Sequence, residues 1–570
     1  MTTIKKLIVT NRSALAKKYG AAGWTAVQQA LTRLRTADTK RGFTTILALL
    51  DAPAAGVPKV KSASSARETK RAIDALYKKY AAPDYVLILG GTDVVPHSVL
   101  KNPIVAGEDE DPDLPSDLPY ACEAPYSTDV SDFVGPTRVV GRLPDIRGSN
   151  EVKDFIKLID AAAKFSGTTG SAHFVISAAI WRGATQANAA LAFGGTPTPE
   201  VVPPKGPGWP TPDLGAPLHF INCHGADKDP NYYGQPANGA RVYPDAHSPA
   251  NLTGTVSAGA VVAAECCFGS QLYHPTGPLV LGISTTYLLE GAIAFLGSTN
   301  TAYGESTAAK RCKADVLCTD FMGAIMKLAT TGRALLEARQ EYVKKAGILD
   351  PFDLKTLGQF LLLGDPSARP YSALPSHAGA PAPKSKTVMS AAHKARRHML
   401  KMDGTRLGRD TPFAMKASRA LPTNTRASLE QIAAQEELAI GKTLRFEIAP
   451  GRADVKAKSD PKRKSKAKPK DSFQVMFERA QPKPKTSSVM PAIRAVAAGE
   501  ALILEGLQVT DSGPPAPQVK EIRAVIARTR DENVLSYSTV ASKSLAWREA
   551  KSPHEEVFRK SGTKALLERL

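Results

Sequence analysis

Two apolar segments of this 570-residue chain each end in residues that can attack a carbonyl or move a proton. PLHFINCH, residues 217–224, ends in a histidine that a glycine follows, and AGAVVAAECC, residues 258–267, ends in two cysteines. Parallel strands gather the residues at their carboxyl ends in one crevice of a sheet. A thiol beside an imidazole provides a nucleophile and its acid/base partner, so we predict that pair in this crevice.

Only one of the two thiols can face His224. Adjacent residues on a strand point to opposite sides of the sheet, so either Cys266 or Cys267 lies toward the crevice and the other packs as a small core residue. Gly225 has no side chain to block a substrate carbonyl, and its backbone N–H is a natural oxyanion-hole donor together with that of the nucleophilic cysteine. His219 lies on the same strand as His224, and we interpret it as structural.

The elements around these residues alternate between strands and helices. KKLIVT, FTTILALLD and DYVLILGG are predicted strands, with helices near residues 24–34 and 66–80 between them. The strand TRVVGRLP, a helix that starts near Ser149 or Asn150 and runs to Phe165, and the strands AHFVISAAI, PLHFINC, AGAVVAAE and AIAFLGS follow. Strands joined by crossover helices form parallel sheets, so the predicted class is α/β.

Seven short segments in a fixed order then resemble a known family. They are GGTDVVP, SDLPYACE, VVGRLPDI, INCHGA, AAECCFGS, AFLGSTNTAYGES and LLLGDPSARP, spread over residues 1–370. Their order resembles the gingipain family of cysteine peptidases, within the wider caspase-like group. The resemblance implies a caspase-like three-layer sandwich around a mostly parallel sheet, a Rossmann-like α/β subdomain before it, and cleavage of protein substrates by a His/Cys dyad.

The resemblance also assigns the members of the dyad. His224 matches the family histidine at the end of an apolar strand. Cys266 matches a nucleophile in the pattern Cys-x-x-Gly, with Gly269 as the glycine. Cys267 is its rival, because another branch of the group places the glycine two residues after the nucleophile. We place Cys266 first.

Substrate preference rests on acidic residues near the dyad. Gingipains and several relatives cut after Arg or Lys and use an acid at the base of the specificity pocket. Asp227, Asp229 and Glu265 are the nearest carboxylates in sequence. The family's histidine-orienting acid is expected after HFVISAAI, but IWRGATQANAA contains neither Asp nor Glu.

An acidic segment precedes the second group of strands. Glu108, Asp109, Glu110 and Asp111 are followed by further acids and by Pro112. Several carboxylate oxygens in one loop are the ligands that calcium prefers, so calcium is a candidate ligand, although no cofactor is required by the predicted chemistry. The alternative interpretation is a solvated acidic loop.

Charge divides the chain into a near-neutral part and a basic part. Residues 1–370 hold 37 basic and 34 acidic side chains, whereas residues 371–570 hold 37 and 20. We predict an N-terminal α/β subdomain at 1–148, a catalytic subdomain at 149–371, a linker and start of an accessory region at 372–451, a disordered basic linker at 452–472 and a small β-rich or α+β module at 473–570.

The basic C-terminal region permits three interpretations. It is an inhibitory or targeting module that cleavage in the basic stretch removes from a zymogen, a nonspecific nucleic-acid contact through lysines, or a linker without a partner. Six cysteines without metal-site spacing do not indicate a disulfide framework, and no signal peptide or membrane span is apparent, so we expect a cytoplasmic protein. The competing functional class is a catalytically silent scaffold that binds nucleic acid or a protein partner through its basic tail.

Overall fold

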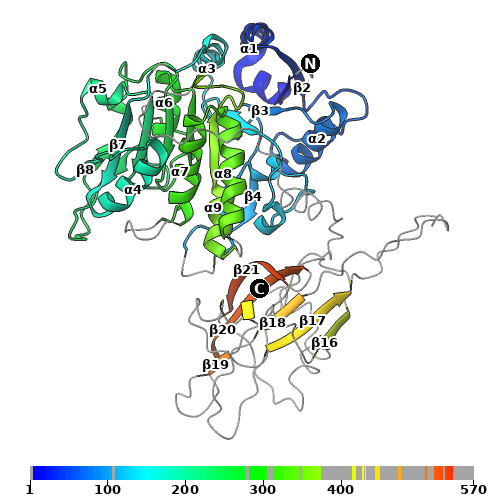
Figure 1. The fold of residues 1–570 in the computed structure, drawn as a ribbon. Helices are drawn as coiled ribbons and strands as arrows, with labels where there is room; N and C mark the ends of the chain where they lie inside the picture. Colours follow the sequence, from blue (N-terminus) through cyan, green and yellow to red (C-terminus); the bar gives the residue numbers. More distant parts are fainter. Residues whose placement is uncertain are drawn as a thin grey trace, which may run out of the picture. The chain divides into compact units, whose positions relative to one another are not determined.

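The computed structural model describes residues 4–104, 109–168, 170–275, 281–304, 312–346 and 349–373. Beyond these it describes the backbone of strands between 414 and 542 and three residues at 427, 428 and 431. The chain divides into two compact units (Figure 1). The first contains the described residues up to 373 except two short segments within 103–110 and 346–352, and the second contains those segments and the later strands.

A ten-stranded sheet forms the centre of the first unit, in the order β2-β1-β3-β6-β15-β14-β13-β9-β7-β8. Its strands are β1 Ile4–Thr10, β2 Phe43–Leu49, β3 Tyr85–Leu89, β6 Val140–Leu143, β7 His173–Ala178, β8 Glu200–Val202, β9 Leu218–Asn222, β13 Val261–Ala264, β14 Ala294–Ser298 and β15 Phe360–Gly364. Within β2-β1-β3-β6 and within β14-β13-β9-β7-β8 all pairs are parallel, and β15 runs antiparallel to β14. The predicted α/β class is confirmed, and this one sheet runs through both predicted subdomains.

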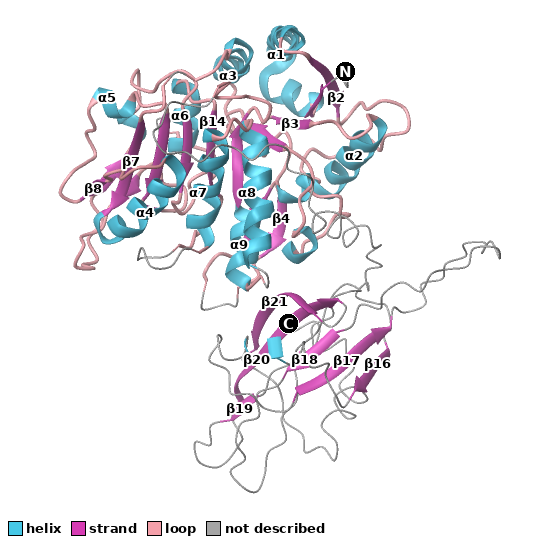
Figure 2. Ribbon diagram, viewed as in Figure 1, coloured by secondary structure: helices cyan, strands magenta, loops and turns pink. Residues whose placement is uncertain are grey.

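Helices on both faces of the sheet make the unit a layered α/β sandwich (Figure 2). They are α1 Arg12–Lys40, α2 Ala66–Lys79, α3 Val152–Lys164, α4 Arg182–Phe193, α5 Thr211–Leu214, α6 Ile283–Glu290, α7 Lys313–Met326, α8 Thr331–Ala346 and α9 Pro351–Gln359. The structure places the start of α3 after the position predicted near Ser149 or Asn150. This helix begins at Val152, and the Ser149 hydroxyl accepts a hydrogen bond from the Glu151 N–H instead of capping the helix.

Side chains of β9 alternate between the α6 face and the α4 face of the sheet. His219 hydrogen-bonds the hydroxyl of Tyr287 on α6, at 2.9 Å between Nδ1 and the oxygen. The next residue, Phe220, stacks edge-on against Phe193 of α4. Odd-numbered positions of β9 therefore face α6, and even-numbered positions face α4.

The neighbouring strand β13 continues the same two faces. Ile221 of β9 pairs in register with Ala264 of β13, so these two side chains share the α6 face. The alternation past the strand ends puts Cys266 on the α6 face, and it puts Cys267 on the same face as His224.

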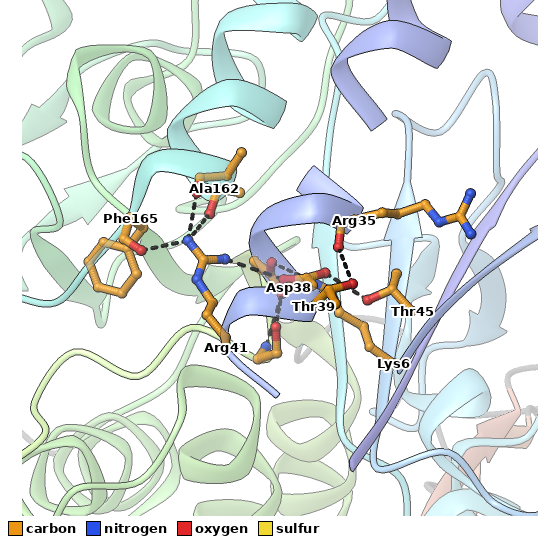
Figure 3. Close-up of polar contacts among 11 residues, drawn as sticks. Lys6, Arg35, Asp38, Thr39, Arg41, Thr45, Ala162 and Phe165 are labelled. Carbon is orange, nitrogen blue, oxygen red and sulfur yellow. Dashed lines mark hydrogen bonds and ion pairs between the residues drawn. The ribbon is translucent and has the colours of Figure 1, made fainter. Parts of the chain in front are cut away.

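A buried ion cluster ties the first strand of the sheet to its surroundings. The Lys6 ammonium lies 3.0 Å from a carboxylate oxygen of Asp38 at the end of α1 and 2.5 Å from one of Asp365, and all three side chains are almost completely buried. Arg41 extends the cluster by donating to Asp38 and to the last carbonyls of α3, including those of Ala162 and Phe165 (Figure 3). Cationic groups stabilise a helix C-terminus, so Arg41 fastens α3 to α1.

The second unit contains a six-stranded antiparallel sheet. Its strands are β16 Ala414–Ser418, β17 Thr443–Ala449, β18 Phe473–Met476, β19 Leu507–Val509, β20 Val519–Arg530 and β21 Asn533–Ser542. Strands β16 and β17 lie in the region 372–451, which the sequence analysis predicted as a linker and the start of an accessory region, and β18 to β21 lie in the module predicted at 473–570. The basic stretch 452–472 lies outside the described residues.

Candidate active site

His224 lies at the start of β10, His224–Gly225, just past the carboxyl end of β9. Its ring, which is half-buried, lies 4.3 Å from the ring of Trp181 and 5.0 Å from that of Tyr243, measured between centroids. Its Nε2 atom hydrogen-bonds Oε1 of Gln235 at 2.9 Å. Burial lowers the pKa of His224 below its ordinary value, and the Gln235 hydrogen bond opposes that shift, so the imidazole is neutral near neutral pH.

Cys266 is buried on the face of the sheet opposite His224. Its exposed fraction is 0%, and its sulfur contacts the Ile221 carbonyl at 3.8 Å. Burial raises the pKa of Cys266 well above the ordinary value, and nearby Cys223 raises it further. A buried thiol held protonated in this way behaves as a small apolar side chain.

Cys267 is partly exposed and has backbone donors around its sulfur. The Ala302 N–H donates to Sγ at 3.3 Å. Burial raises the pKa of Cys267, while the N–H groups of Ala302 and Gly225 and the ammonium of Lys355 lower it. These donors stabilise negative charge on the sulfur, which is what a nucleophilic thiol requires.

The backbones of Gly225 and Cys267 touch directly. A Cβ atom added at Gly225 would lie 2.0 Å from the Cys267 carbonyl oxygen, so only glycine fits. The next residue, Phe268, has φ of 56°, a left-handed conformation that is rare for a bulky side chain. Strain of this kind concentrates at functional sites, where the surrounding structure holds the backbone in place.

A buried ion pair lies beside the Cys267 sulfur. The Lys355 ammonium is 2.5 Å from Oδ2 of Asp111, and the Lys355 side chain has no exposed area. The same carboxylate accepts the Thr301 N–H at 2.9 Å. The ammonium also lies 5.3 Å from the centre of the Tyr303 ring. The two charges of this pair act on the thiol in opposite directions, because Lys355 lowers the pKa of Cys267 and Asp111 raises it.

The acidic segment has mixed environments in the structure. Asp109 is buried, Glu110 is exposed, Asp111 binds Lys355, and Glu108 lies outside the described residues. Among the residues that the structure describes, no group of three or more His, Cys, Asp or Glu side chains could hold a metal ion. The calcium interpretation stays a prediction.

The three carboxylates considered for substrate binding are not gathered at one place. Asp227 is exposed and binds Lys228 and Gln271. Asp229 accepts the Tyr233 hydroxyl at 2.8 Å. Glu265 is 8% exposed and lies two residues before Cys267, where its charge raises the pKa of Cys318 on α7.

Three further histidines of the described chain differ in burial. His219 bridges Tyr287 and the Ala216 carbonyl, and burial lowers its pKa to about 4, as a structural role predicts. His247 is fully buried and bonds the same Tyr287 hydroxyl. His274 is exposed and bonds the neighbouring Pro275 carbonyl.

Gln235, Trp181, Tyr243 and Lys355 have no counterpart among the residues predicted from sequence. Gln235 lies in a glycine-rich loop without a recognisable motif, and Trp181 follows β7 in the segment that lacked an acid. Lys355 is separated from Cys267 by four secondary-structure elements along the chain. Only folding brings these side chains to the dyad, so no local spacing could reveal them.

Residues 237–371 match the model of Peptidase family C25. This segment is that of a cysteine-type peptidase. The gingipain-type resemblance seen in the sequence is thereby confirmed. The C25 segment contains both candidate cysteines, whereas His224, Gly225 and Gln235 lie just before it. A search of curated proteins finds no match.

Solved structures give weaker likenesses. A structure described only as that of a protease shares 12% identity over 95% of this chain and 98% of its own, with a TM-score of 0.43. The Arg-specific cysteine proteinase gingipain R shares 10% over 94% and 97%, with a TM-score of 0.44. The separase–securin complex of Saccharomyces cerevisiae shares 12% over 41% of this chain and 14% of its own, with a TM-score of 0.24.

Among the described residues of the C25-like chain, no helix is long and apolar enough to cross a membrane.

Proposed function

We propose that this chain is a cysteine endopeptidase in which Cys267, rather than Cys266, attacks the peptide carbonyl and His224 moves the proton. The observation that carries the proposal is the backbone contact between Gly225 and Cys267, which brings the two strand ends together on one face of the sheet. Cys266 belongs to the opposite face, in a fully buried position.

The directions of the two pKa shifts suggest how the proton moves. Burial raises the pKa of Cys267 and lowers that of His224, so the resting pair is a neutral thiol and a neutral imidazole. His224 takes the thiol proton as the sulfur bonds to the carbonyl carbon, then gives it to the leaving amine as the C–N bond breaks. Water, deprotonated by His224, hydrolyses the resulting thioester and regenerates the thiol.

Backbone donors complete the proposed machinery. The Gly225 N–H lowers the pKa of the Cys267 thiol, which supports the proposal that it donates to the oxygen of a carbonyl that the sulfur attacks, together with the N–H of Cys267 itself. Loss of one such donor typically lowers kcat by about 100-fold or more.

The test compares two substitutions in the full chain, each of which removes one cysteine thiol. Purified wild type, Cys267→Ala and Cys266→Ala are incubated with a peptide library, and products are identified by mass spectrometry. We expect Cys266→Ala to cleave and Cys267→Ala to be inactive. The reverse pattern would restore the Cys266 assignment, and absence of cleavage by wild type would favour the scaffold alternative.

Cleavage after Arg or Lys is the substrate preference we propose, with Glu265 as the acid that recognises it. Glu265 is the buried carboxylate of the three candidates and shares the face of Cys267. Glu265→Gln should lower kcat/KM for peptides with Arg or Lys before the cut at least tenfold and leave neutral peptides unchanged. Asp227→Asn, at an exposed carboxylate, is the matched control.

A C-terminal region removed from a zymogen is a further part of the proposal. It rests on the lysine-rich composition of 452–472, which an enzyme that prefers basic residues would cut. Intact-mass measurement over time should show cleavage within this stretch in wild type and an unchanged mass in Cys267→Ala. Salt-dependent binding of single-stranded DNA with no cleavage would instead favour the nucleic-acid interpretation.

A further inference from the structure

Gln235 is almost completely buried beside the histidine of the proposed dyad. It is 8% exposed and lies between β11, Tyr232–Tyr233, and β12, Asp245–His247. Its side-chain Oε1 hydrogen-bonds Nε2 of His224 at 2.9 Å. An imidazole has two ring nitrogens, so Nδ1 is the one left for the thiol.

Two other contacts fix which way the Gln235 amide points. Its Nε2 donates to the carbonyl oxygens of Gly239 and Ala240, each at 3.3 Å. If the amide were turned over, its own oxygen would face both carbonyl oxygens and no donor would be present. The oxygen of Gln235 therefore faces His224, and it can only accept a hydrogen bond.

This orientation determines the tautomer of His224. An acceptor at Nε2 requires that Nε2 carries the hydrogen, so Nδ1 of the neutral ring has a lone pair. A lone pair at Nδ1 is what a general base needs to take the proton of Cys267. The amide thus sets both the orientation and the protonation pattern of the ring.

The backbone of Gln235 is anchored as firmly as its side chain. Its N–H donates to the Val202 carbonyl at the end of β8, and its carbonyl accepts the Ile180 N–H, both at 3.1 Å. Ile180 belongs to the turn η3, Ala179–Trp181, whose last residue packs on the ring of His224. A backbone hydrogen bond therefore joins Gln235 to the segment that contains Trp181, and both side chains contact the imidazole.

We infer that Gln235 is a positioning residue that orients His224 in place of the acid which the resemblance led us to expect after HFVISAAI. This inference rests on the proposed function and specifies how the proposed general base, His224, is held in position. A neutral amide accepts the Nε2–H as a carboxylate does, but it adds no negative charge to stabilise the imidazolium.

Charged and titratable groups approach the ring from several of the described elements. Tyr243 packs on it, Tyr233 pairs with it across β10 and β11, and Arg182 follows Trp181 on α4. Cys267 is the reacting partner. None of these supplies a carboxylate to His224, so a glutamate introduced at position 235 should change the proton affinity of the base more than any existing neighbour does.

The kinetic test uses the full chain with Gln235→Ala, Gln235→Glu and, as a matched control, Gln340→Ala. Gln340 donates to the Pro136 carbonyl from α8. With a quenched fluorescent peptide that wild type cleaves, Gln235→Ala should lower kcat about 100-fold because the base loses its orientation. Gln235→Glu should retain most of the activity, with the acidic limb of kcat moved up by about one pH unit or more, because a carboxylate favours the imidazolium. Gln340→Ala should match wild type.

A second measurement does not depend on peptide cleavage. Long-range ¹H–¹⁵N spectra of the chain labelled with [¹⁵N]histidine, with His224 assigned by His224→Ala, should show the Nε2–H tautomer in wild type and a mixture of tautomers in Gln235→Ala. An Nδ1–H tautomer in wild type, or an unchanged acidic limb in Gln235→Glu with normal activity in Gln235→Ala, would overturn the inference. An inactive wild type that shows the Nε2–H tautomer would contradict the proposed function while supporting the role of Gln235.

Discussion

Two crevices at the carboxyl ends of parallel strands differ in how their polar groups are satisfied. One lies beyond β1, β3 and β6, where Asp145 accepts the Gly91 N–H and the Tyr19 hydroxyl and pairs with Lys18 at 2.7 Å. The other lies beyond β9 and β13 and holds His224 and Cys267.

In the first crevice, the charged side chains form ion pairs with one another. Lys18 also pairs with Asp93 at 2.7 Å, so two carboxylates at these strand ends share one ammonium. Tyr19 is held protonated, since burial and Asp145 raise its pKa far above the ordinary value.

In the second crevice, the hydrogen-bond partners of His224 and Cys267 are neutral: the amide of Gln235 and the N–H of Ala302. Neutral partners hold the two groups in place and leave their protons free to move. The same position in a sheet therefore serves stability in one case and, in our proposal, chemistry in the other.

The largest expected effect is at the two glycines that line these crevices. Gly225→Ala places a Cβ 2.0 Å from the Cys267 carbonyl, and Gly91→Ala places one 2.9 Å from an Asp145 carboxylate oxygen. We expect Gly225→Ala to lower kcat/KM by about 100-fold or more because it displaces a proposed oxyanion donor. Gly91→Ala should lower the melting temperature and leave kcat/KM of the folded enzyme near wild type. Equal activity losses in both variants would remove the distinction between the crevices.

Two lysines provide the next comparison. Lys355→Met leaves Asp111, whose side chain is 10% exposed, without its ion-pair partner, which should cost up to about 3 kcal/mol of unfolding free energy, and it removes the charge that lowers the pKa of Cys267. Lys18→Met should affect stability alone. Denaturant unfolding gives the first quantity, and the pH at which Cys267 reacts with iodoacetamide gives the second. A Lys355→Met thiol that titrates as in wild type would show that the pair has no influence on the nucleophile.

The pH dependence of activity depends on the neutral hydrogen-bond partners of His224. The folded-state pKa of His224 lies below its ordinary value of 6.5, and the base must be neutral, so kcat/KM, which reports the free enzyme, should rise with pH through a value below 6.5 and then level off. Because the pKa of Cys267 is raised, the alkaline limb should lie above its ordinary value of 9.0. An acidic limb above 6.5 would indicate a carboxylate near His224. It would contradict the account in which the hydrogen-bond partner of His224 is neutral.

The smallest expected effect concerns calcium. Asp111 of the acidic segment already binds Lys355 and the Thr301 N–H. We therefore expect peptide cleavage to be unchanged when EGTA or millimolar calcium is added. A reproducible increase in kcat with calcium, absent with magnesium, would support the metal-binding interpretation of that segment.

Much of the fold and the residues of the proposed pair could be predicted from local pattern. Apolar runs bounded by turns marked the strands β1, β3, β9 and β13, and the strand ends marked His224 and the two thiols. The choice between the thiols required knowing which face of β13 each occupies, and that depends on α4 and α6, which pack from elsewhere in the chain. Gln235 and Lys355 could not be predicted, since their roles depend on a loop and a helix brought to the dyad only by tertiary packing.

The most direct test of the central claim is to find which cysteine an electrophilic substrate mimic modifies. The full chain is treated with a peptidyl acyloxymethyl ketone with Arg or Lys at the reactive end, digested, and mapped by mass spectrometry. We predict an adduct on Cys267 that is lost in His224→Ala, with Cys266 unmodified. An adduct on Cys266, or equal labelling of Cys267 with and without His224, would contradict the proposed pairing of Cys267 with His224.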